Sequence, residues 1–228
     1  NWFGAVKWGG EPKVIFDENG NRHEAKHING YLSEAETVFI EGRKKPLGDV
    51  AEVNYGSFAL DDGNFTISEE EYGELVARDP DVVTLLRPFI GAQELLHNKK
   101  RYCVWLRDAS PAEIRKHTAI MDKVERVKNW RAASNRANTK ALALTPTLFA
   151  EVRQPPTDYL GIPTVCSERR EYLPIAFLSN DVIASNQLYI VPSADKSLFG
   201  ILMSRVHMAW MRTVCGRLKS DYRYSAAI

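Results

Sequence analysis

Residues 101–130 read RYCVWLRDASPAEIRKHTAIMDKVERVKNW, a strand pattern followed by a helix pattern. The first six residues, Arg101–Leu106, alternate and are rich in aromatic and β-favouring side chains, which predicts a strand. Ser110-Pro111-Ala112-Glu113 is a strong helix start, because Ser caps, Pro suits the first helical position and Glu closes a capping box. Apolar side chains then recur at helical spacing, which predicts a helix to about Ala133. This stretch therefore indicates a fold that contains both element types.

The flanking sequence extends this pattern in both directions. Short strands are expected at residues 14–16, 37–40, 65–67, 148–152, 162–166, 172–178 and 187–191. The capping box Ser68–Glu71 opens a short acidic helix. A final helix is expected from Leu198 to Cys215, with its buried face marked by Leu198, Leu202, Val206 and Trp210. We therefore predict an α+β fold with a mixed or antiparallel sheet and two main helices.

The composition bounds the kind of protein. The 228 residues are 44% hydrophobic and include five Trp, enough for a core, which excludes a disordered chain. No apolar run approaches the roughly 18 residues of a membrane span, and the start lacks a signal peptide. The missing initiator Met suggests a piece of a longer protein. Three distant cysteines argue against a disulfide framework or a zinc site and fit a reducing cytoplasm.

Charge is unevenly distributed along the chain. Residues 1–97 hold nine basic and eighteen acidic side chains, which gives a net charge of −9. Residues 98–228 hold twenty-one basic and eleven acidic side chains, which gives a net charge of +10. Such a basic half suggests a polyanionic partner, although a solvated basic face is an open alternative. Arg43-Lys44-Lys45-Pro46 marks a possible boundary. We expect residues 1–45 to form a linker or edge segment and residues 46–228 to form the main domain.

Catalytic signatures are missing from the sequence. It has no glycine-rich phosphate loop, no GxSxG elbow and no convincing nuclease core. His23 and His27 lack the Glu that a zinc protease needs, so their spacing is better explained as coincidence. Gln154-Pro155-Pro156-Thr157 superficially resembles the catalytic loop of amino-methyltransferases, but a proline turn is the better interpretation. We expect no catalytic residue, metal or cofactor within this chain.

Several stretches of the chain resemble the type IIL, or MmeI-like, restriction–modification enzymes. The most specific is residues 207–225, HMAWMRTVCGRLKSDYRYS. The others are residues 86–94, 100–106, 145–149, 151–155, 167–170 and 172–175. Residues 46–53 also resemble the opening of recognition domains in type I specificity subunits. The resemblance extends along most of the chain and is to the target-recognition domain that follows the methyltransferase motifs.

The resemblance implies a role in reading double-stranded DNA for a larger bacterial cytoplasmic enzyme. In that family one polypeptide carries an endonuclease domain, an S-adenosylmethionine-dependent adenine methyltransferase domain and this recognition domain. The S-adenosylmethionine pocket, and the Mg²⁺ used for cleavage, would then lie outside the chain, as would a C-terminal helical part. The methyltransferase domain of the same polypeptide would be a partner, and no membrane would be involved.

Base-reading candidates follow from the pairing rules of the major groove, where Arg suits guanine, Asn suits adenine and Glu accepts from cytosine. Residues 167–170 are expected to form a turn between strands, and by the alternation of a strand Glu168 and Arg170 would share a face while Arg169 points away. In the resembled family the matching segment is associated with base choice. A surface salt bridge is the alternative for this pair. Asn135 and Arg136 follow the basic helix, where polar helix-end residues are the alternative.

Phosphate contacts should outnumber base contacts. The candidates are basic side chains in three clusters, and some of them will only be solvated. They are Lys99, Lys100, Arg101, Arg126, Lys128, Arg131, Arg217, Lys219 and Arg223.

Two other classes of function are open at this point. The chain could be a structural or partner-docking domain without base reading, with its acidic part facing another protein. It could also be a stand-alone nuclease, which would show metal-dependent activity. The recognition sequence and the oligomeric state cannot be derived from these patterns.

Overall fold

The computed structural model describes residues 13–30, 32–39, 48 and 52–225. The chain divides into two compact units, Asn1–Gly42 and Arg43–Ile228. In the first unit, β1 (Lys13–Phe16) pairs with β2 (Arg22–Ala25) as an antiparallel hairpin. The turn forms because Gly20 adopts φ +81° and the Asp17 carboxylate accepts from the backbone N–H groups of Asn19 and Asn21. The expected strand at 37–40 is wrong for residues 37–39, and residue 40 lies outside the described part.

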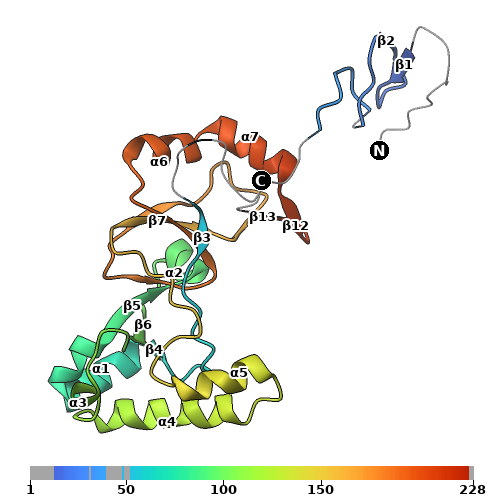
Figure 1. The fold of residues 1–228 in the computed structure, drawn as a ribbon. Coiled ribbons are helices and arrows are strands. Elements are labelled where there is room, and N and C mark those ends of the chain that lie inside the picture. Colours follow the sequence, from blue (N-terminus) through green and yellow to red (C-terminus); the bar gives the residue numbers. More distant parts are fainter. Residues whose placement is uncertain (1–12, 31, 40–47, 49–51, 226–228) are drawn as a thin grey trace. The chain divides into compact units, whose positions relative to one another are not determined.

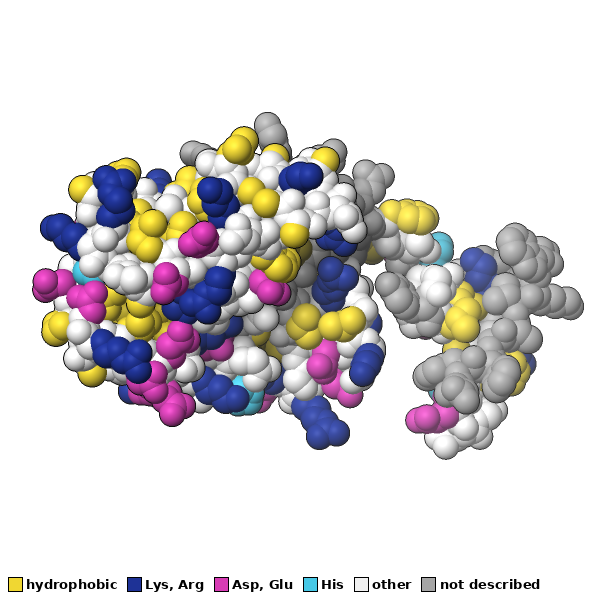
Figure 2. Space-filling view, turned by 90° about the horizontal axis from the view of Figure 1, so that it is seen from below, with side chains coloured by type: hydrophobic (Ala, Val, Ile, Leu, Met, Phe, Trp, Pro, Cys, Tyr) yellow, Lys and Arg dark blue, Asp and Glu magenta, His cyan; other side chains and the backbone are white. Residues whose placement is uncertain are grey.

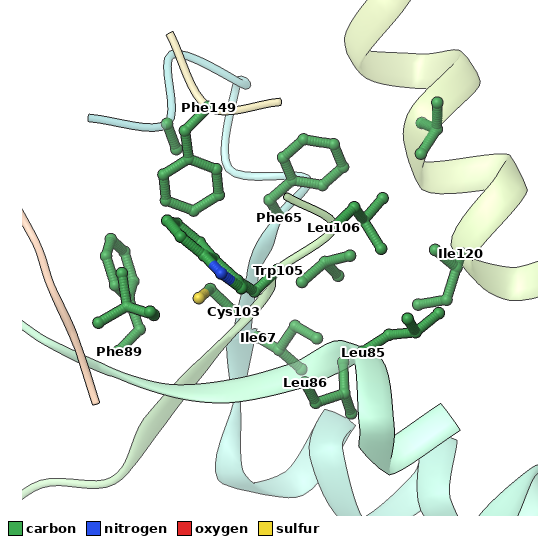
Figure 3. Close-up of a cluster of buried hydrophobic side chains, with 14 of the residues drawn as sticks. Phe65, Ile67, Leu85, Leu86, Phe89, Cys103, Trp105, Leu106, Ile120 and Phe149 are labelled. Atoms are coloured by element: carbon green, nitrogen blue, oxygen red, sulfur yellow. The ribbon is translucent and has the colours of Figure 1, made fainter. Parts of the chain in front are cut away.

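The second unit contains a mixed four-stranded sheet of order β10-β5-β6-β4. Its strands are β4 (Thr66–Ser68), β5 (Leu86–Ile90), β6 (Arg101–Val104) and β10 (Ile183–Ala184). β10 runs parallel to β5, and the other pairs are antiparallel. The core beside it holds Phe65, Phe89, Trp105 and Phe149, whose rings contact one another through Phe149 (Figure 3).

Helical segments accompany this first sheet. They are α1 (Glu69–Arg78), η1 (Pro80–Leu85), α2 (Ala92–His97), α3 (Pro111–Ile114), α4 (Thr118–Ala132), α5 (Ala137–Ala141) and η2 (Leu142–Leu144). The two predicted caps are present, because Ser68 Oγ accepts from Glu71 N–H and Ser110 Oγ from Glu113 N–H, each at 3.1 Å. The single helix expected to end near Ala133 is instead α3 and α4. Between them His117 is extended, with its Nδ1 2.6 Å from Asp79 Oδ2.

A second antiparallel sheet of order β3-β11-β7-β9 lies toward the other end of this unit (Figure 1). Its strands are β3 (Asn54–Tyr55), β7 (Tyr159–Pro163), β9 (Ala176–Leu178) and β11 (Leu188–Pro192). The expected strand at 148–152 is wrong, because only Glu151 forms a bridge, with Phe58. The expected strand at 172–178 is shortened to Ala176–Leu178.

A third sheet and two helices complete the unit. The sheet has the order β12-β13-β8 and consists of β8 (Val165–Cys166), β12 (Gly216–Leu218) and β13 (Asp221–Arg223). The expected final helix is two helices, α6 (Lys196–Leu202) and α7 (Arg205–Val214), because Ser204 caps the second by accepting from His207 N–H at 3.1 Å. Met208 and Met211 are buried against the second and third sheets.

The predicted α+β class, with mixed and antiparallel sheets, is confirmed. The prediction of two main helices needs correction, since each of them is broken. Figure 1 shows the described residues of the second unit, with α4 and α5 at one end, α6 and α7 at the other, and the sheets between them.

Candidate nucleic-acid interface

The segment Ser167–Arg170 forms the turn that the sequence predicts between strands. β8 ends at Cys166, and Arg170 N–H donates to Ser167 O at 3.1 Å, which closes the turn. The Glu168, Arg169 and Arg170 residues are exposed. The predicted turn between strands is confirmed, but strand alternation does not apply within it, because the backbone reverses after Cys166. Strand alternation therefore gives no reason to prefer Arg170 over Arg169 in this turn.

The turn lies directly against the C-terminal hairpin β12–β13. β13 pairs with β8 through Tyr222↔Cys166 and Arg223↔Val165. The structure thus joins two clusters that are about 50 residues apart in the sequence, the predicted base readers and the basic residues of 217–223.

The hairpin carries three exposed cations. The Arg217 guanidinium lies 3.8 Å from the Tyr222 ring centroid and donates to Ser220 O at 2.8 Å, which fixes its direction. Lys219 occupies the hairpin turn with φ +57°. Within the described part of the chain, Arg217, Lys219 and Arg223 have no carboxylate within ion-pair distance. Their charge is therefore available for an external anion.

Asn135 and Arg136 lie in the connection between α4 and α5. Both are exposed, and Ser134 Oγ accepts from Arg136 N–H at 3.2 Å. Among the described residues, no hydrogen bond or ion pair joins this connection to the 167–170 turn. The structure therefore presents two separate groups of base-reading candidates on one unit.

Arg131 is not available for a phosphate contact, which corrects the sequence prediction. Its side chain is 0% exposed. The guanidinium donates to five backbone carbonyls, at distances of 2.8 to 3.3 Å, from Ala59, Leu60, Leu142, Thr145 and Leu148. Burial lowers the pKa of the guanidinium, and the Asp61 carboxylate opposes that shift. The sequence shows a basic helix, but not which of its cations points inward.

The rest of α4 is less basic at the surface than its sequence suggests. Lys123 is buried and lies 2.6 Å from Glu71 Oε1. Arg126 and Lys128 are exposed beside Asp122 and Glu125. Figure 2, seen from the end where α4 lies, shows acidic side chains interspersed with basic ones. Arg126 and Lys128 stay predicted phosphate contacts, without a continuous basic patch around them.

The predicted phosphate-binding cluster at residues 99–101 has internal partners. Lys100 Nζ lies 2.6 Å from Glu69 Oε1, and the pKa of Lys100 is raised by that hydrogen bond. Arg101 is partly buried, bonded to Glu94 Oε2 at 2.8 Å and stacked 4.7 Å from the Phe89 ring centroid. Lys99 is exposed. Lys100 and Arg101 would have to exchange these partners to hold a phosphate.

The described residues contain neither a metal-ligand cluster nor a membrane-spanning helix. Among the described residues, no three His, Cys, Asp or Glu side chains are grouped as metal ligands would be. No helix in the described part is long and apolar enough to cross a membrane.

Comparison with known proteins supplies the context for this surface. Residues 34–228 match the protein family described as "MmeI, target recognition domain". The chain is 36% identical over 202 residues to "DNA methyltransferase A" of Bacillus subtilis (strain 168), covering 89% of this chain and 23% of that protein. A solved structure of the type IIL restriction–modification enzyme MmeI in complex with DNA matches with 37% identity and a TM-score of 0.84.

The MmeI structure matches 96% of this chain and 30% of its own chain. The chain thus spans less than a third of either relative. Its fold and its sequence agree with one part of a longer enzyme. On these matches, the chain belongs to the target-recognition domains of MmeI-like restriction–modification enzymes.

Proposed function

We propose that this chain selects the DNA sequence on which a larger restriction–modification enzyme acts. The observation that carries the proposal is the exposed turn Ser167–Arg170 fastened to the cationic hairpin 216–223. A turn with carboxylate and guanidinium groups suits base edges, and unpaired cations beside it suit phosphates. The similarity to MmeI, whose structure was solved with DNA, supports double-stranded DNA as the partner.

Each exposed side chain takes a role set by its chemistry. Glu168 accepts from a cytosine amino group, and Arg169 or Arg170 donates two hydrogen bonds to a guanine. In the second group, Asn135 pairs with adenine and Arg136 with guanine. Phosphate contacts hold the DNA backbone and set the register of the protein on it. The exposed candidates for this role that have no ion-pair partner among the described residues are Arg217, Lys219, Arg223, Arg126, Lys128 and Lys99.

For the whole protein we propose a bifunctional enzyme that cleaves DNA and methylates adenine. Methyl transfer would use S-adenosylmethionine and cleavage would use Mg²⁺, both in domains of the same polypeptide outside this chain. The names of the two relatives support methylation and restriction. A bacterial cytoplasm, where such an enzyme meets DNA, is the proposed location. This chain itself would carry no catalytic residue.

The test is selection of preferred sites from a randomised duplex library by the chain. We expect enrichment of a defined sequence. The charge exchange Glu168→Lys with Arg170→Asp should change the preferred base at one or two positions and leave the others unchanged. A matched exchange on the first unit, Arg22→Glu with Glu24→Arg, should change none.

Two results would contradict the proposal. Binding without enrichment would favour a docking domain that holds DNA without reading it. Cleavage of duplex DNA by this chain with Mg²⁺ would instead indicate a stand-alone nuclease.

A further inference from the structure

The exposed turn is held from behind by two other elements. The Glu168 N–H donates to Asp221 Oδ1 at 3.3 Å, so the first residue of β13 fixes the backbone at the start of the turn. Arg212 of α7 donates from Nη2 to Arg170 O at 3.3 Å, which fixes its end. Both contacts engage the turn through its backbone and leave its side chains free to face outward.

The electrostatics around Cys166 agree with this arrangement. Burial raises the pKa of the Cys166 thiol at the end of β8. The charges of Arg170 and Arg212 lower that pKa, and the charge of Asp221 raises it. The same three charged residues thus influence the thiol at the residue from which the turn departs.

We propose that Asp221 is a positioning residue for base recognition, which holds the Glu168–Arg170 backbone in the register that presents its side chains to base edges. The proposal rests on the proposed function. Hydrogen bonds to base edges tolerate only a few tenths of an ångström, so a loose turn would bind DNA but discriminate poorly. Asp221 also lies in the same hairpin as Arg217 and Arg223, so it connects the proposed phosphate contacts to the turn Ser167–Arg170.

Two substitutions separate this role from a simple effect of charge. Asp221→Asn removes the negative charge but keeps the Oδ1 acceptor for Glu168 N–H. Asp221→Ala removes both. Both variants should gain similar affinity for random DNA, since each loses one negative charge beside the proposed phosphate contacts. Only Asp221→Ala should lose sequence discrimination.

The experiment measures, by fluorescence anisotropy, the affinity of the chain for its selected duplex and for a random duplex. We expect the ratio of the two affinities to fall about tenfold in Asp221→Ala, the size of one lost base-pair preference, and to stay near wild type in Asp221→Asn. An unchanged ratio in Asp221→Ala, or an equal loss in both variants, would overturn the positioning role. If the wild-type chain prefers no sequence, the proposed function itself fails.

Amide hydrogen exchange gives a second readout that does not involve DNA. The Glu168 amide should exchange faster in Asp221→Ala and remain protected in Asp221→Asn, while the amides of β7 stay protected in both. Unfolding of the Asp221→Ala variant would expose β7 as well, so this measurement distinguishes a released turn from a lost fold. Equal Glu168 protection in all three proteins would contradict the proposal.

Discussion

Arg131 shares a helix with Arg126 and Lys128, yet its position makes it part of the core. Five carbonyl oxygens from the segments 59–60 and 142–148 accept hydrogen bonds from its guanidinium. An arginine without its usual solvent partners is tolerated in a core only when its donors are satisfied in this way. The side chain thereby joins α4 to two segments distant in the sequence.

Arg131→Met should therefore destabilise residues 43–228 by about 3 kcal/mol or more, because buried carbonyls lose their donors. Its effect on the salt dependence of DNA binding should be negligible in whatever fraction remains folded. Urea unfolding followed by circular dichroism measures the first effect.

Lys128→Met on the same helix is the matched control. Its exposed side chain predicts a stability change within about 0.5 kcal/mol. If Lys128 contacts a phosphate, the salt slope of binding should fall by about 0.9. Equal stability of the two variants would contradict the buried role of Arg131.

His207 at the start of α7 makes stability depend on pH. Burial lowers its pKa below the ordinary 6.5, and its Nε2 lies 3.3 Å from the Tyr224 hydroxyl. Burial also raises the pKa of Tyr224 to about 12, so that group is neutral here. The folded state favours neutral His207. The unfolded state therefore binds the His207 proton more tightly than the folded state does. The stability contributed by neutral His207 is complete above pH 6.5, and it is lost as the pH falls from there through the lowered pKa of the folded state.

The check compares the free energy of unfolding of wild type and His207→Gln at pH 7.5 and pH 5.5. Wild type should lose more stability on acidification than the variant does. The difference between the two proteins isolates His207 from the other histidines. A difference that does not change with pH would contradict the assignment.

At the scale of elements, α6 and α7 show why a pattern alone misplaced a buried face. Leu198, Leu202, Val206 and Trp210 line one face only if the helix is continuous. The break at Ser204 changes the helical phase, so Val206 is 80% exposed and Met211 is 0% exposed.

Met211→Ala should accordingly cost about 2–5 kcal/mol of unfolding free energy, the usual loss for a buried methionine. Val206→Ala, on the same helix, should change it by less than about 0.5 kcal/mol. Thermal unfolding of the two single variants makes the comparison. A larger loss for Val206→Ala would restore the original assignment of the buried face.

Local signals predicted the helix caps and several strands correctly, but not where the helices break or which side chains turn inward. The caps at Ser68 and Ser110 and the strand that begins at Arg101 follow from short-range chemistry and are present, although the strand ends at Val104 rather than Leu106. The inward direction of Arg131 and the anchoring of the 167–170 turn depend on residues far away in the sequence. The turn's two outside anchors, Asp221 and Arg212, are more than 40 residues away. The basic hairpin was visible as a charge cluster, but its contact with the turn was not.

At the scale of the whole molecule, the division at Gly42 predicts independent behaviour of the larger unit. All the candidate DNA contacts lie after residue 43. A chain of residues 43–228 should keep its unfolding midpoint and bind DNA within about twofold of the full chain, since no proposed phosphate contact is lost. Anisotropy titrations of both chains test this, and a large loss of affinity would assign part of the surface to residues 1–42.

The most direct test of sequence reading is the salt dependence of binding to two duplexes, one selected by the chain and one random. We expect the affinity for both duplexes to fall steeply with salt, and the selected duplex to bind more tightly at every salt concentration. Superimposed lines for the two duplexes, or no binding to either at low salt, would contradict this expectation.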